Sequence, residues 1–188
     1  MVISYNEKIN LGEVSKDTHF YFSNDSHKVH LKGNEINSYS FSKPGIYTIA
    51  VVEKENHQKG SCTERHLPKE IVVEVSRIKM IFDSDAIFFS SPILKNRSTE
   101  GIVLSIPVSI QTFDHREAKL NMTSVNSAGI GTNITATLDN RFGELPEGNH
   151  VLQYALKGLV TENAYLMFDF IDANSLIQSV SLTKPVIN

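Results

Sequence analysis

Four aspartates in two short segments are the residues of this chain best suited to bind a metal ion. Asp83 and Asp85 lie in "FDSDA", and Asp169 and Asp172 lie in "FDFIDAN". Calcium takes six to eight oxygen ligands, which loops at the end of a β-sandwich can supply. Neither segment has the longer fixed pattern of an EF-hand loop, and Asx residues at strand ends are usually turn formers. The sequence therefore leaves two interpretations open, a calcium site or a pair of turns.

Other reactive side chains occur without the partners that catalysis requires. Cys62 is the only cysteine of the chain and has His57 and His66 nearby. A nucleophilic thiolate needs a lowered pKa and a third, orienting group, and the polar segment "QKGSCTERH" is typical of a loop. His27 and His30 are three residues apart, so on a strand they point to opposite sides and cannot share a metal. We expect no catalytic residues and no cofactor.

Aromatic side chains suggest a second kind of binding site, one for glycans. Exposed rings stack on sugars, but the chain has no tryptophan, so its stacking surface would be weaker than usual. Packing in a core or between domains is the competing interpretation. The candidate aromatic residues are Tyr5, Tyr21, Phe22, Phe88, Phe89, Phe113, Tyr165 and Phe168.

The overall composition is that of a folded chain with no strong charge. Of the 188 residues, 40% are hydrophobic and 21% are charged, and the formal net charge is −3. No lysine or arginine cluster stands out, which argues against nucleic acid and anionic membranes as partners. No apolar run approaches the roughly 20 residues of a membrane span, and the start of the chain has no signal-peptide pattern. The single cysteine fits a reducing cytosol and a bacterial exported domain equally well.

Strands are the elements that must position these residues, because the dominant hydrophobic period is two. Turn signals such as "KGNE", "SKPG", "DHRE" and "LPEGN" separate the alternating segments. No window of helical length shows a 3.6-residue period, so we expect an all-β protein. The expected strands are 18–23, 27–32, 38–42, 46–52 (with Tyr47, Ile49 and Val51 on the inner face), 70–82, 86–90, 101–113, 133–138, 150–158, 164–170 and 177–182.

A Pro-Gly corner followed by an alternating strand occurs twice. In "SKPGIYTIAVVEKEN", Pro44 ends the preceding segment and Gly45 permits a positive φ. The same order of corner and strand returns in "LPEGNHVLQYALKG" about a hundred residues later. Two copies of one unit predict two β-sandwiches in tandem, over residues 1–77 and 78–188, with little linker between them.

Pro107 interrupts the alternating strand "GIVLSIPVSIQTF". Proline has no N–H for a central ladder, so this strand should lie at a sheet edge or carry a bulge. An exposed edge can accept a partner strand, and we therefore expect Ile106, Pro107 and Val108 to mark an interaction site.

Residues 39–75 resemble the second half of a PKD domain, an immunoglobulin-like sandwich. The matching positions of that family's Y-x-F-x-x-P-G-x-Y-x-V signature are Tyr39, Phe41, Pro44, Gly45, Tyr47 and Ile49. The W-x-F-G-D-G hairpin of the family is missing. Residues 78–188 are similar to bacterial Ig-like domains, in which an L-P-x-G-x-H-x-L corner introduces the penultimate strand.

The resemblance implies a secreted or surface-anchored bacterial protein, commonly of the Bacteroidetes type. Domain pairs of this kind serve in spacing, adhesion or assembly with other envelope components. The expected function is thus that of a non-enzymatic, extracytoplasmic interaction or spacer module whose partner is another envelope or surface protein. The alternative is an accessory glycan- or calcium-binding domain of a secreted enzyme or adhesin.

Overall fold

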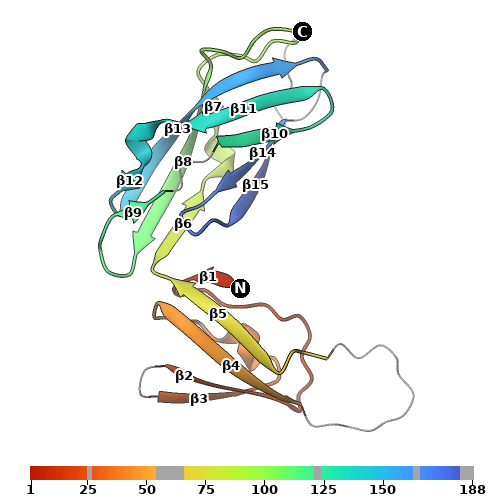
Figure 1. The fold of residues 1–188 in the computed structure, drawn as a ribbon, viewed down its shortest axis with the longest axis vertical. Coiled ribbons are helices and arrows are strands. Elements are labelled where there is room, and N and C mark those ends of the chain that lie inside the picture. The colour runs from red at the N-terminus through yellow and green to blue at the C-terminus, as the bar shows by residue number, and fades with distance from the viewer. Residues whose placement is uncertain (25–26, 54–65, 121–123, 163–165, 183–188) are drawn as a thin grey trace, which may run out of the picture. The chain divides into compact units, whose positions relative to one another are not determined.

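The computed structural model describes residues 1–24, 27–53, 66–120, 124–162 and 166–182. It divides the chain into two compact units, Met1–Arg77 and Ile78–Asn188 (Figure 1). Both units are built mainly from strands, so the prediction of an all-β protein is confirmed.

The first unit contains one five-stranded sheet with the order β1-β5-β4-β2-β3. Its neighbouring strands are antiparallel except for β1, which runs parallel to β5. A single helical turn, α1 (Glu35–Ser38), follows β3. The strands are β1 (Val2–Ser4), β2 (Thr18–Asn24), β3 (His27–Lys32), β4 (Gly45–Glu53) and β5 (Glu70–Ser76).

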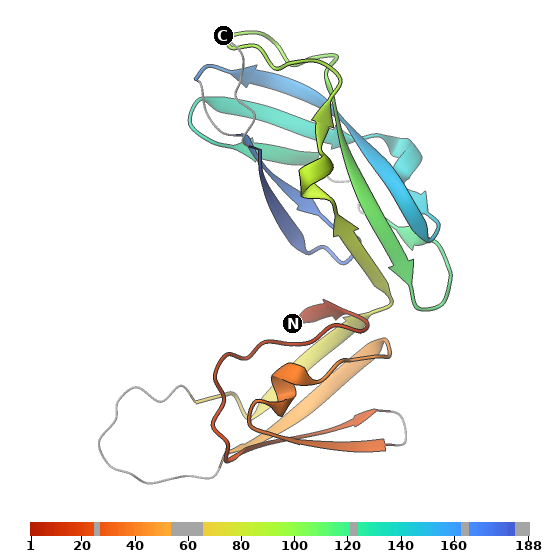
Figure 2. The same cartoon turned by 180° about the vertical axis from the view of Figure 1, so that it is seen from behind.

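One face of this sheet forms the core of the first unit. Burial alternates along β4, where Tyr47, Ile49 and Val51 are buried and the residues between them are exposed, as the period of two predicts. Figure 2 shows α1 in front of the sheet, on the covered face. The buried cluster comprises Ile9, Val14, Phe20, Phe22, Ile36, Phe41, Tyr47, Ile49, Val51, Ile71, Val73 and Val75.

The layer that covers this face is not a second sheet in the described part of the unit. Asn37 accepts a hydrogen bond from the Leu11 N–H at 2.8 Å and donates one to the Gly12 carbonyl at 2.7 Å. Asn34 accepts one from the Val14 N–H at 3.0 Å. These amide side chains satisfy backbone groups that a strand partner would otherwise satisfy. The covering segment therefore needs no ladder of its own.

The strand expected over 38–42 is wrong. Ser38 ends α1, and Phe41 forms only an isolated bridge with Glu7. Tyr39 and Phe41 alternate with polar residues because both rings pack inward, and their rings contact each other edge to face at 4.9 Å. The two-residue hydrophobic period here comes from a loop with two inward side chains, and the sequence alone cannot distinguish such a loop from a short strand.

The second unit contains an eight-stranded sheet with the order β15-β14-β10-β11-β13-β8-β6, with β7 beside β8. A small separate sheet joins β9 and β12. Short 3-10 turns, η1 (Ser84–Ala86) and η2 (Asn140–Phe142), lie between strands. The strands are β6 (Ile78–Phe82), β7 (Phe88–Phe89), β8 (Val103–Thr112), β9 (Ala118–Lys119), β10 (Ser124–Ala128), β11 (Thr132–Leu138), β12 (Glu144–Leu145), β13 (Gly148–Val160), β14 (Leu166–Ile171) and β15 (Ile177–Leu182).

Side chains from β15 and from the turn before it bond to β6, the strand at the opposite end of the large sheet. Gln178 donates to the Met80 carbonyl at 3.1 Å and accepts from the Phe82 N–H at 3.4 Å. Asn174 donates to the Ile78 carbonyl at 2.9 Å. The sheet thus curls until its first and last strands are bridged by amide groups, which satisfy three backbone groups on the open edge of β6.

The two corners have the same local geometry. Gly45 has a φ of +146° and Gly148 a φ of +133°, values that other residues rarely adopt. Two residues after each glycine, a side chain bonds to the carbonyl four positions back. The Tyr47 hydroxyl donates to the Lys43 carbonyl at 2.8 Å, and a His150 ring nitrogen lies 2.8 Å from the Pro146 carbonyl. The repeated motif read in the sequence is therefore also a repeated structure.

The expected exposed edge at Pro107 is corrected by the sheet order, since β8 lies between β13 and β6. Ile106 and Val108 are 0% and 2% exposed, so neither is available to a partner. Pro107 is tolerated because the strand next to it on the side of β6 is interrupted at this position, between the end of β6 and the start of β7. The Pro107 carbonyl accepts from the Asp83 N–H just after β6 ends, and β7 resumes the pairing at Ser105. The missing proline N–H faces this break.

Candidate interaction surface

The outer face of the first unit's sheet has no covering layer in the described part of the chain, and we call it the open face. It lies opposite the buried cluster, and Figure 1 is viewed from this side, with α1 behind the sheet. Its side chains come from alternate positions of four strands. They are Lys28, His30 and Lys32 on β3; His19, Tyr21 and Ser23 on β2; Ile46, Thr48, Ala50 and Val52 on β4; and Glu70, Val72 and Glu74 on β5.

The middle of the open face is apolar and exposed to solvent. Ile46 is 74% exposed, Val52 50%, Val72 47% and Tyr21 44%. A single exposed apolar residue is ordinary, but several on one sheet face are typical of an association surface.

Three rings form a stack on β2 and β3. The planes of Tyr21 and His30 are within 2° of parallel, with centroids 4.5 Å apart, and His19 lies 5.1 Å from His30. Nδ1 of His19 and Nε2 of His30 are 2.8 Å apart, so one nitrogen donates its proton to the other. The rings cover one another's faces, which leaves less ring surface for sugar stacking than separate exposed rings would.

The sequence does not predict this ring cluster, because it places His19 near His27 and His30 along the chain but does not give the register between their strands. The register of β2 and β3 is what brings the rings together, since it places Tyr21 opposite His30 and His19 opposite Lys32. The signal that could have found it is the alternation of His19 and Tyr21 on one strand with His30 on the next, on the same face of a hairpin.

Charge is distributed unevenly across the open face. Lys28 and Lys32 lie on the edge strand β3. Glu70 and Glu74 lie on β5 toward the other side, where β1 is the edge strand. Among the residues that the structure describes, none of these four side chains forms an ion pair. The cations and anions are separated by β2 and β4, so they cannot neutralise each other within one molecule.

The four aspartates proposed for calcium do not meet in one group. Asp83 accepts a hydrogen bond from the Asp85 N–H at 3.2 Å and caps η1. Asp172 is 4% exposed, and its carboxylate accepts from the N–H groups of Asn174 and Leu176. Asp169 is exposed on β14. No three His, Cys, Asp or Glu side chains cluster as a metal site in the described ranges. Asp83 and Asp172 are turn formers here, and calcium binding stays a prediction.

A shallow groove on the second unit does join two of the predicted sites. Asp83, Asp85 and Pro107 line it together with Ile81 and Val151. The groove crosses β6, β8 and β13 on their outer face. It is wide open and lacks the enclosed, convergent polar groups of a small-molecule site.

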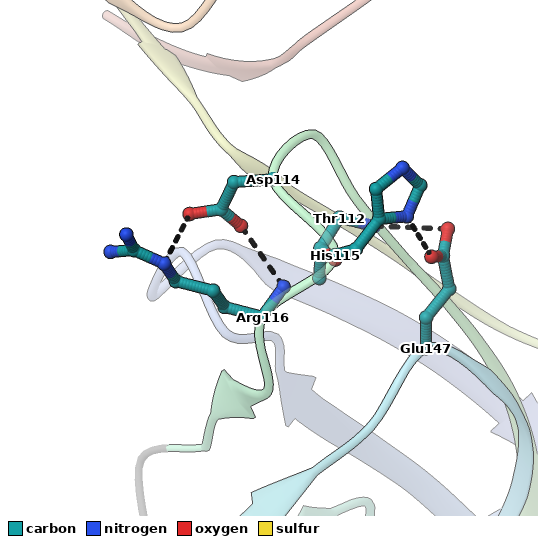
Figure 3. Close-up of polar contacts among 5 residues, drawn as sticks. All are labelled: Thr112, Asp114, His115, Arg116 and Glu147. Carbon is teal, nitrogen blue, oxygen red and sulfur yellow. Dashed lines mark hydrogen bonds and ion pairs between the residues drawn. The ribbon is translucent and has the colours of Figure 1, made fainter.

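A polar cluster lies at the loop between β8 and β9 (Figure 3). His115 Nδ1 is 2.9 Å from a Glu147 carboxylate oxygen, and the other oxygen accepts from the Thr112 N–H at 3.4 Å. The bond from His115, supported by that from Thr112, holds the pKa of Glu147 below its ordinary value. Asp114 accepts from the Arg116 N–H at 3.3 Å. These bonds fix the loop against the Gly148 corner, and no Ser or Cys nucleophile is among the residues of the cluster.

Two of the remaining candidates lie outside the described residues, namely Cys62 with His57, and Tyr165. His66 is described and lies 3.2 Å from the Glu53 carboxylate. In the ranges covered by the structure, no helix has the length and apolar character needed to cross a membrane. Comparison with protein-family models, curated proteins and solved structures finds no match to this chain.

Proposed function

We propose that this chain is a non-enzymatic interaction module of a bacterial envelope or surface protein, and that the open face is its association surface. The observation that carries the proposal is the exposure of Ile46, Val52, Val72 and Tyr21 on one face of the sheet. Burying these side chains against a partner removes apolar surface from water, at roughly 25 cal/mol per Å².

Two strands of the second unit, β10 and β11, support this choice of surface by contrast. On the outer face of β10 and β11, Ser124 and Thr137 hydroxyls lie 3.1 Å apart, and the Thr135 hydroxyl donates to Asn126 at 3.0 Å. These groups satisfy one another across the strands. That face is polar and already paired, whereas the open face is apolar at its centre.

The corners support the finer proposal of tandem Ig-like, PKD-like units. A tyrosine that bonds back to the backbone a few residues upstream is a feature of immunoglobulin-type folds. Tyr47 makes this bond in the first unit, and His150 makes its counterpart in the second. The curled sheet of the second unit and the Asn-supported layer of the first are then variants of two-layer β architecture.

A photo-crosslinking residue at Thr48, in the centre of the open face, tests the proposal in cells that make the protein. We expect one discrete adduct whose protein component is identified by mass spectrometry and is lost in the Val52→Lys variant. Thr137, on the polar outer face, is the matched control position. Adducts of equal amount from both positions, or none from Thr48, would reject the open face as the association surface.

A further inference from the structure

The charge layout of the open face identifies a partner, provided that this face is the association surface proposed above. Cationic side chains lie on β3, apolar side chains lie on β2 and β4, and the anionic Glu70 and Glu74 flank Val72 on β5. A surface with opposite charges at its two sides is complementary to a second copy of itself. We infer that the partner is a second copy of this chain, packed face to face about a two-fold axis.

The direction of the two-fold axis follows from the charges. An axis that lies between the two sheets and runs parallel to the strands places β3 of one copy over β5 of the other. Lys28 and Lys32 then face Glu70 and Glu74 of the second copy twice, once at each side. An axis perpendicular to the strands would instead place β3 over β3 and oppose lysine with lysine, which like-charge repulsion disfavours. The parallel axis is therefore the favoured one.

The register of the strands sets the height of each charged residue. His30, Tyr21, Ala50 and Glu70 form one row across the sheet. Neighbouring rows on a face are two residues apart, or roughly 6.8 Å. Lys32 lies in the neighbouring row, together with His19 and Val52. A lysine stem spans such a distance while it covers apolar surface, so the ammonium group reaches the opposing carboxylate.

The second pair follows the same rule. Lys28 lies in the row next to the Glu70 row on the side away from Lys32, and this row also contains Thr48 and Val72. Glu74 lies in the following row, together with Ile46. Each lysine is thus one row from a glutamate of the second copy. Two sheets packed in this way also cross at about −30°, because each is twisted, and the four pairs remain within the reach of the long side chains.

The apolar centre fits the same axis, which passes between β2 and β4. Tyr21 then lies over Ala50 of the second copy, and His19 lies over Val52 of the second copy, by the common rows. Large side chains meet small ones, which is how the inner faces of two stacked sheets interdigitate. The exposed tyrosine is thus placed as an anchor near the centre of the interface.

The experiment is a charge exchange between two variants of the full chain, followed by sedimentation equilibrium. K28E/K32E makes both sides of the open face acidic, and E70K/E74K makes both sides basic. We expect the unmodified chain to dimerise, each variant alone to self-associate at least tenfold more weakly at low salt, and an equimolar mixture to form a heterodimer as tight as the original dimer. High salt should weaken the heterodimer and relieve the repulsion within each variant.

A matched control separates the pattern of charge from its amount. K119E/K157E makes the same change in net charge on exposed strands of the second unit and should leave dimerisation unchanged. Within the described ranges, the four substituted side chains on the open face form no ion pair, so circular dichroism spectra of the variants should match the original.

The outcomes are distinguishable from those of the proposed function. A chain that stays monomeric up to about 1 mM, where even a weak dimer would be populated, overturns the inference. So does a mixture of the two variants that forms no heterodimer. If the Thr48 adduct then contains a different protein, the open face is still an association surface with another partner. If Thr48 gives no adduct either, both proposals fall.

Discussion

Replacing Gln178 with leucine tests whether an amide side chain closes the sheet of the second unit. The substitution keeps the size of the side chain and removes its hydrogen-bonding atoms. It takes the acceptor from the Phe82 N–H and the donor from the Met80 carbonyl, which lie at 3.4 and 3.1 Å in the native chain. It also removes a 3.4 Å bond to the Asp172 carboxylate.

The expected loss of stability follows from these three contacts. A typical hydrogen bond contributes about 1 kcal/mol net, and a buried group left unpaired costs about 1–3 kcal/mol. Two of the contacts are long, and leucine regains some apolar burial. We therefore expect the free energy of unfolding of the second unit to fall by roughly 2–3 kcal/mol.

Gln178→Glu refines the prediction, because glutamate keeps the acceptor and loses the donor. Its carboxylate would face the Met80 carbonyl and the Asp172 carboxylate, so its destabilisation should at least equal that of leucine. Both variants are compared by urea denaturation and by hydrogen exchange of the Phe82 amide, which should become faster. Gln111→Leu, at an exposed position of β8, is the control and should change neither.

The reasoning would be refuted by a specific result. If the Phe82 amide stays as protected in Gln178→Leu as in the native chain, and the denaturation midpoint does not move, then the edge of β6 is satisfied without this side chain. The curl of the sheet would then depend on its core rings alone, such as Phe82 and Phe170 at 5.4 Å.

Three further predictions concern the corners, pH and calcium. Gly45→Val should destabilise the first unit by about 1–3 kcal/mol through backbone strain alone, because nothing lies within 4 Å of the added Cβ; thermal unfolding measures it, and no change would mean that the corner relaxes. Since the pKa of Glu147 is lowered by folding, its contribution to stability is present above the ordinary glutamate pKa and is lost as the pH falls through the lowered value. Glu147→Gln should flatten that part of the curve of stability against pH, and an unchanged curve would contradict the pairing with His115. Millimolar calcium should not raise the melting temperature, because Asp172 is already bonded by backbone groups, and a rise would revive the calcium site.

Local features of the sequence predicted local structure well. Alternation along 46–52 predicted which side chains of β4 are buried, because a strand exposes alternate residues to opposite faces. Gly45, for which the sequence predicts a permitted positive φ, has a φ of +146°, and Gly148 in the repeated corner has a φ of +133°. Both values are strained for a residue that carries a Cβ.

What could not be predicted depends on pairing between distant segments. The sequence shows that Pro107 lacks an N–H, but only the sheet order shows that the adjacent strand is interrupted beside it, between β6 and β7. His19 and His30 meet through the register of a hairpin, and one residue of slip would separate them. The cover of the first unit rests on Asn34 and Asn37, whose bonds reach 20 to 26 residues along the chain.

The parallel pairing of β1 with β5 has a mechanical consequence. Val2, Ile3 and Ser4 pair with Glu74, Val75 and Ser76, so the two ends of the first unit lie on adjacent strands that run in the same direction. Tension applied between these ends pulls β1 backward and β5 forward along one axis. All the hydrogen bonds between them are then loaded together in shear, whereas an antiparallel pair held at one end would unzip bond by bond. A unit built this way unfolds under force at a rate set by its unfolding barrier, and it resists a sudden pull better than its modest number of strand pairs suggests.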